Sequence, residues 1–162
     1  MLHGQYINRL TKDMGHAKVP YDWAIIQAGG NDLAWNNPPE VIYEKMQAVW
    51  DIPLKAGVKV LALTITEHSH FSPKMKAKWE KLNDLVSSHQ QEGFYVAHVA
   101  KAIPWTGMDE KERTKIWDDG VHLTKEGYEL MGDTIADRLI DIVKEQQPLG
   151  TSHNSDTHGL RI

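Results

Sequence analysis

The stretch Tyr21-Asp22-Trp23-Ala24-Ile25-Ile26-Gln27-Ala28-Gly29-Gly30-Asn31-Asp32 decides the fold class. Its apolar run, residues 21–27, follows Pro20 and stops at two glycines, a pattern that predicts a buried strand leading into a loop. Two further apolar runs lie at residues 59–66 and 94–99. The run at 59–66 is apolar at nearly every position, which is typical of a strand covered on both faces.

Helical patterns separate these predicted strands. Apolar residues recur at helical spacing after Pro38-Pro39, and a second helix is predicted from about Pro73 to Gln91. Thr124 is the expected N-cap of a final amphipathic helix. Strands that alternate with helices in this way indicate an α/β fold with a parallel sheet flanked by helices.

Composition bounds the function. A chain of 162 residues suits a single domain, and 41% hydrophobic with 25% charged residues excludes global disorder. The net charge of −4 without a basic run argues against a nucleic-acid partner. The absence of cysteine excludes disulfides, thiolate catalysis and Cys-ligated zinc. No apolar stretch is long enough for a membrane span, and we expect an intracellular chain.

Residues 1–147 are expected to form the domain, and the polar residues 148–162 a disordered tail.

Two loops at the predicted carboxyl ends of the sheet carry chemistry, because ligand sites in open parallel sheets lie at that edge. In Asp119-Gly120-Val121-His122-Leu123, an Asp three residues before a His can accept the Nδ1 proton and leave Nε2 as a general base. In the loop at 29–32, the Asn31 amide can donate to an oxyanion. Ordinary turn chemistry explains either loop equally well when each is taken alone.

Taken together and in this order, the two motifs resemble those of the SGNH hydrolases, also called the GDSL esterase/lipase family. The resemblance covers about residues 21–143. It implies a flavodoxin-like three-layer α/β/α fold and hydrolysis of a small-molecule ester by a serine nucleophile, with no cofactor or metal. At the matching positions it implies that Gly29 and Asn31 form part of the oxyanion hole and that Asp119 and His122 are the acid and base of a triad. The family spacing selects Asp119 over the adjacent Asp118.

The chain also departs from the family pattern. The family's Gly-Asp-Ser motif, which carries the nucleophile, and its second oxyanion glycine do not occur. A strand with its crossover helix needs about 30 residues, and only a short amphipathic helical segment with Ile7, Leu10 and Met14 precedes residue 21. We therefore expect a chain that lacks the first two strands and is inactive as given. The alternative is an inactive interaction module that dimerises through the sheet edge left open.

The loop after the second predicted strand contains further polar candidates. The resemblance implies that His68 and His70 border the substrate, whereas a polar loop capping the next helix is the simpler interpretation. Ser69 and Ser72 are poor nucleophile candidates, because nothing in the sequence places them against His122. His68 and His70 with Glu67 would also suit half a zinc site, but no third ligand has a confirming spacing.

Two other side chains have competing interpretations. Trp35, directly after the Asn31 loop, is a candidate wall of the substrate site, with core packing as the simpler alternative. His98 falls inside the third apolar run and is predicted to be a core histidine.

Overall fold

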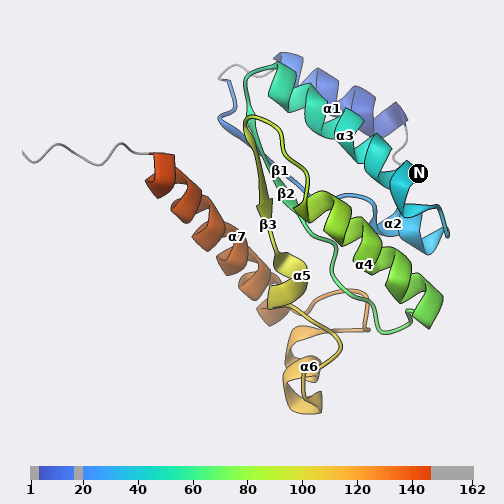
Figure 1. Ribbon diagram of the computed structural model, residues 1–162. Helices are drawn as coiled ribbons and strands as arrows, with labels where there is room; N and C mark the ends of the chain where they lie inside the picture. The colour runs from blue at the N-terminus through green and yellow to red at the C-terminus, as the bar shows by residue number, and fades with distance from the viewer. Residues whose placement is uncertain (1–3, 17–19, 147–162) are drawn as a thin grey trace, which may run out of the picture.

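The computed structural model describes residues 4–16 and 20–146. In this part of the chain, the three predicted strands form one parallel sheet in the order β1-β2-β3 (Figure 1). The strands are β1 (Trp23–Ile26), β2 (Lys59–Leu63) and β3 (Phe94–Ala97). Each is shorter than its apolar run, because the flanking residues form the loops into and out of the sheet. The α/β prediction is confirmed, whereas the predicted tail at 148–162 lies outside the described residues.

The long helices also form where the sequence predicts them. They are α1 (Gly4–His16), α3 (Pro39–Lys55), α4 (Pro73–Ser87) and α7 (Lys125–Gln146). Thr124 caps α7, since its Oγ1 accepts from the backbone N–H of Gly127 at 3.1 Å. Three short helices were not predicted: α2 (Gly30–Ala34), α5 (Val99–Ala102) and α6 (Glu110–Ile116). Each is too short for a helical period to show in the sequence.

The helices cover the two faces of the sheet in separate layers. Figure 1 shows α1, α3 and α4 on one face and α7 on the other, which gives the flavodoxin-like three-layer arrangement. The core between the sheet and α3 and α4 includes the fully buried Trp50, Val60 and Leu82. Ile142 of α7 packs on the opposite face. No described helix is long and apolar enough to cross a membrane.

Strand β1 lies at an edge of this sheet, and its α7 face is only partly covered. Ile25 pairs in register with Leu61 and therefore points to the same face. Leu61 is fully buried in the cluster under α7, whereas Ile25 is 49% exposed. Arg138 of α7 donates its Nε to the carbonyl of Val96 on β3 at 3.2 Å, and Ile142 of α7 packs with Leu61 of β2, so the helix lies over β2 and β3. The described residues thus leave the flank beside β1 open.

Candidate active site

Asp119 and His122 lie on the loop between α6 and α7, and their side chains meet. The His122 Nδ1 lies 2.8 Å from Asp119 Oδ2. The other carboxylate oxygen, Oδ1, accepts from the backbone N–H groups of Val121 at 2.9 Å and His122 at 2.7 Å. A positive φ of 81° at Gly120 allows the chain to turn this tightly. The predicted Asp-x-x-His pairing therefore forms within a single turn, which we call the Asp119–His122 turn.

These contacts shift the pKa values of Asp119 and His122 in opposite directions. The backbone N–H of His122 and the His122 ring hold the pKa of Asp119 well below its usual range. The hydrogen bond to Asp119 raises the pKa of His122, and the negative charge of Asp119 acts in the same direction. The carboxylate stays ionised and stabilises the imidazolium. Because Nδ1 faces Asp119, Nε2 of the exposed ring is the nitrogen that can exchange a proton with a substrate group.

The loop after β2 lies directly against this turn. The backbone N–H of Ser69 donates to the carbonyl of Gly120 at 2.9 Å. A Cβ at residue 120 would clash with the Ser69 side chain and would lie 3.2 Å from the ring of Trp105. Only glycine fits this space.

His68, the residue before Ser69, belongs to the same surroundings. Its ring stacks on Phe71 with centroids 4.9 Å apart. Burial lowers the pKa of His68, and positive charge on His122 and His70 lowers it further. The structure thus places His68 within the electrostatic reach of the Asp119–His122 turn. His70 is more exposed.

The two serines of this loop have other surroundings. Ser72 Oγ accepts from the backbone N–H of Met75 at 3.2 Å and caps α4. This confirms the capping interpretation for Ser72. The Ser69 hydroxyl is buried against Gly120, and among the described residues it has no hydrogen-bond partner.

Asn31 lies in α2, at the carboxyl end of β1, and its side chain is exposed. The loop before it turns at Gly29, where φ is 93°. A Cβ there would lie 3.0 Å from Ile42 and 3.3 Å from Ile65, so the loop is packed tightly on α3 and on the start of the loop after β2. Gly29 is therefore required by packing as well as by its backbone conformation.

Helix α4 supports the Asn31 helix and the loop after β2. Lys78 Nζ donates to the carbonyl and the side-chain oxygen of Asn36, just after α2, at 2.8 and 2.7 Å. Asn83 binds both backbone groups of Ile65, accepting at 2.8 Å and donating at 2.9 Å. One helix thus fixes the end of the Asn31 helix and the start of the loop after β2.

Two sequence interpretations need correction. Trp35 is 80% exposed, so the core-packing alternative is wrong and the ring is free to contact a ligand. His98 is exposed at the N-terminal end of α5, so the prediction of a core histidine is also wrong. The strand ends at Ala97, and His98 therefore falls in the turn that leaves the sheet.

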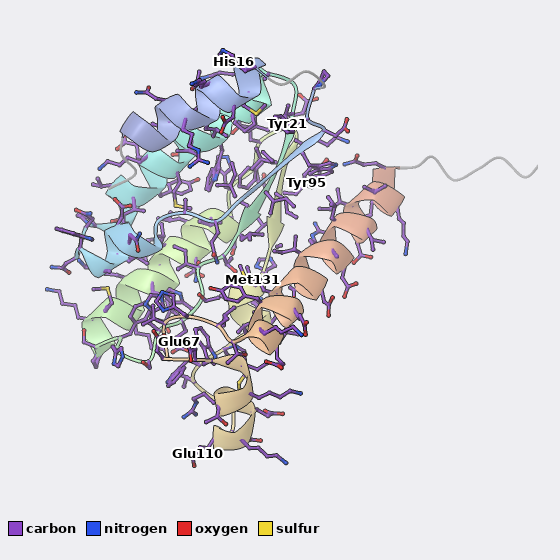
Figure 2. All side chains as sticks on the ribbon, turned by 180° about the vertical axis from the view of Figure 1, so that it is seen from behind. His16, Tyr21, Glu67, Tyr95, Glu110 and Met131 are labelled. Atoms are coloured by element: carbon purple, nitrogen blue, oxygen red, sulfur yellow. The ribbon has the colours of Figure 1, made fainter. Side chains whose placement is uncertain are left out.

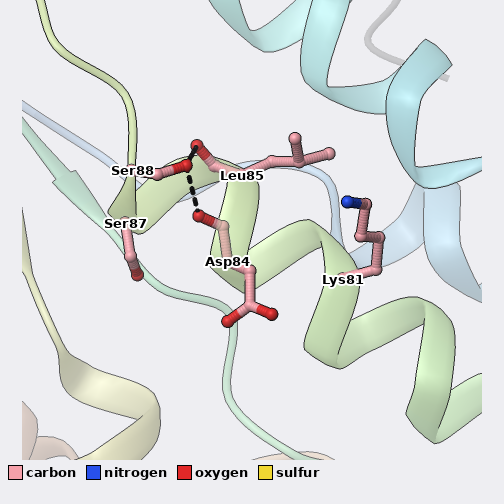
Figure 3. A pocket seen from close by; sticks show the side chains of 5 residues that line it. All are labelled: Lys81, Asp84, Leu85, Ser87 and Ser88. Atoms are coloured by element: carbon pink, nitrogen blue, oxygen red, sulfur yellow. Dashed lines mark hydrogen bonds between the residues drawn. The ribbon is translucent and has the colours of Figure 1, made fainter.

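Two other features do not form a site with these residues. Among the described residues, no group of three or more His, Asp or Glu could hold a metal ion, so the zinc hypothesis gains no third ligand. A surface hollow lies along the C-terminal half of α4 (Figure 3). It is lined by Lys81, Asp84, Leu85, Ser87 and Ser88, and it contains none of the candidate residues.

Comparison with known proteins agrees with the motifs and the fold. The profile of the GDSL-like lipase/acylhydrolase family matches residues 3–130, which include both candidate loops. The chain belongs to this family. The resemblance inferred from the two motifs is therefore confirmed, and at family level the chain is a hydrolase. No curated protein sequence matches it significantly.

Solved structures of two GDSL proteins and of a carbohydrate esterase share the fold. A member of the lipolytic G-D-S-L family from Veillonella parvula has a TM-score of 0.66 at 13% identity, over 81% of this chain and 70% of its own. A GDSL-like lipase from Bacteroides thetaiotaomicron has a TM-score of 0.65 at 19% identity, over 85% and 70%. A carbohydrate esterase of family 3 from Talaromyces cellulolyticus has 0.63 at 19%, over 86% and 66%.

Proposed function

We propose that this GDSL-family chain provides the acid–base pair and one oxyanion donor of an ester hydrolase. The observation that carries the proposal is the 2.8 Å contact between His122 Nδ1 and Asp119, with the carboxylate fixed by two backbone N–H groups. This arrangement sets the tautomer and the orientation of the imidazole, as a triad requires. The exposure of the His122 ring is also needed, because an Asp-x-x-His turn with a buried Nε2 could not exchange a proton with a substrate.

The proposed reaction is acyl transfer to a serine. His122 Nε2 takes the proton of the serine hydroxyl while the oxygen attacks the ester carbonyl, and Asn31 donates to the tetrahedral oxyanion. His122 then gives that proton to the leaving alcohol as the ester bond breaks. Water repeats the sequence on the acyl-enzyme, and the free acid and the serine are restored.

The nucleophilic serine of this reaction has no matching motif in the sequence. Gly-Asp-Ser is absent from the sequence, and the residues that the structure describes leave the flank beside β1 open. Ile25 on β1 is 49% exposed. A strand paired with β1, with a helix over Ile25, would cover this apolar side chain. We propose that a segment of this kind carries the nucleophile, and that the chain as given is inactive.

The substrate would lie between the candidate loops. Trp35 follows the Asn31 helix with an exposed ring, and His68 lies beside the Asp119–His122 turn. We assign Trp35, His68 and His70 to substrate contact. Among proteins with this fold, one is named a carbohydrate esterase, and an exposed indole suits stacking on a sugar ring. A sugar ester is therefore a reasonable first substrate to assay.

A chimaera tests the proposal. The segment of a family member that contains Gly-Asp-Ser and the first two strands, with the helix between them, is joined ahead of α1. The chimaera should hydrolyse p-nitrophenyl acetate and take up a fluorophosphonate label on the added serine. The chain alone should do neither, because loss of the nucleophile costs a triad enzyme a factor of about 10⁶ in turnover. Stoichiometric labelling of Ser69 or Ser72 in the chain alone would contradict the proposal.

A further inference from the structure

Glu67 is a buried carboxylate that the proposed reaction does not use. It lies in the loop after β2 (Figure 2). The residue is only 5% exposed. Its Oε2 accepts from the backbone N–H groups of Trp105 at 3.1 Å and Thr106 at 2.7 Å. Its Oε1 accepts from the Thr106 hydroxyl at 2.6 Å and from Lys76 at 2.9 Å. A buried charge is tolerated only when it is paired in this way.

The carboxylate stays ionised at neutral pH. Burial works to raise the pKa of Glu67, but the hydrogen bonds from Thr106 and Lys76 outweigh it and hold the pKa below its usual value. Glu67 therefore joins two segments that are far apart in the sequence, the loop after β2 and the segment at residues 105–106, through charge-assisted hydrogen bonds.

Both of these segments contact the Asp119–His122 turn. On one side, Ser69, two residues after Glu67, donates its backbone N–H to the carbonyl of Gly120. On the other side, the Trp105 ring lies against Gly120 and packs edge-on against Trp117 with centroids 5.6 Å apart. Trp117 in turn forms a bridge with Leu123, which closes the base of the turn. Gly120, the residue after Asp119, is thus held from two sides by segments that Glu67 ties together.

We propose that Glu67 is a positioning residue: it fixes the Ser69 and Trp105 segments around Gly120 and so keeps Asp119 and His122 in contact. It acts through these segments, because its hydrogen bonds go to Lys76, Trp105 and Thr106. The inference rests on the proposed function, since a held imidazole matters only if His122 is the base.

Two variants of Glu67 and one matched control test this role. Glu67→Ala removes every acceptor, whereas Glu67→Gln keeps a carbonyl oxygen for the backbone N–H groups of Trp105 and Thr106. Asp51→Ala is the control, because Asp51 on α3 also accepts from a lysine and an amide, Lys55 at 2.7 Å and Gln91 at 3.3 Å, away from the turn. The readouts are the NMR titration of the His122 ring and the hydrogen-exchange rate of the Ser69 amide.

Glu67→Ala should remove most of the elevation of the His122 pKa and speed exchange at Ser69 by about tenfold or more. In Glu67→Gln, the His122 pKa and the Ser69 exchange rate should return towards their values in the unchanged protein. Asp51→Ala should change neither of these two readouts. A Glu67→Ala protein whose Trp105 and Thr106 amides exchange faster, while His122 and Ser69 are unchanged, would overturn the proposal, because Glu67 would then be structural only.

If Glu67→Ala does not fold, hydrogen exchange in the unchanged chain still tests the role of Glu67. The Ser69 and Thr106 amides should then exchange at rates within about threefold of each other, because one clamp opens both segments. Rates that differ by more than about tenfold would overturn the proposal. An ordinary His122 pKa in the unchanged chain would instead count against the proposed function, and the exchange rates would still decide the role of Glu67.

Discussion

The two halves of the candidate site are held in different ways. The acid–base half is contained in four consecutive residues, and Asp119 bonds to both the ring and the backbone of His122. The oxyanion half depends on packing: Gly29 presses against Ile42 and Ile65, and the Asn31 side chain is exposed beside β1. A short local motif can therefore supply all the contacts within a proton-transfer pair, even though neighbouring segments hold the turn in place, whereas a place for an oxyanion is formed only by neighbours from across the sheet.

This difference predicts that the acid–base half gives the larger losses of activity. In the chimaera that supplies the serine, Asp119→Asn should lower kcat by about 10⁴, because the amide favours the wrong imidazole tautomer. Asp118→Asn is the matched control and should be nearly silent, because the Asp118 backbone N–H, not its carboxylate, bonds to His122 O at 2.9 Å. Steady-state kinetics on p-nitrophenyl acetate measures both. If Asp118→Asn lowers kcat strongly and Asp119→Asn lowers it only slightly, Asp118 and not Asp119 is the acid of the triad.

The oxyanion half should give a smaller loss. Asn31→Ala in the same chimaera should lower kcat by about 10² to 10³, the usual effect of removing one oxyanion donor. KM should change less, since the donor acts mainly on the transition state. Separate determination of kcat and KM checks this. If the substitution mainly raises KM, Asn31 binds the substrate rather than the oxyanion.

The packing of the Asp119–His122 turn can be tested without any activity. Gly120 and Gly107 both have positive φ, 81° and 91°, but only at Gly120 would a Cβ meet other atoms. Gly107→Ala should cost about 1–2 kcal/mol in the free energy of unfolding from backbone conformation alone. Gly120→Ala should cost about 1–3 kcal/mol more, from the clash with Ser69 and Trp105. Urea unfolding of the two variants measures the difference, and equal losses would show that the turn is loosely packed.

The sequence predicted the parts of this molecule that have local signals. The three apolar runs became β1, β2 and β3, and the Asp-x-x-His spacing produced the contact between Asp119 and His122. The environment of Glu67 was not predictable, because two of its donors are backbone N–H groups 38 and 39 residues away, and these have no sequence signature. For Trp35, only the core-packing alternative is wrong, and the reason is related: the exposure of the ring depends on how α2 packs, and a five-residue helix is too short to show a helical period in the sequence.

The pairing of Asp119 with His122 is the central claim, and an NMR titration of the His122 ring in the chain itself tests it most directly. Because the carboxylate stabilises the imidazolium, His122 should keep its proton to a higher pH than an ordinary histidine, whose pKa is about 6.5. Asp119→Asn should lower the pKa of His122 to that ordinary value or below, and Asp118→Asn should leave most of the elevation in place. A His122 that titrates as an ordinary histidine in the unchanged chain, or that does not respond to Asp119→Asn, would contradict the account.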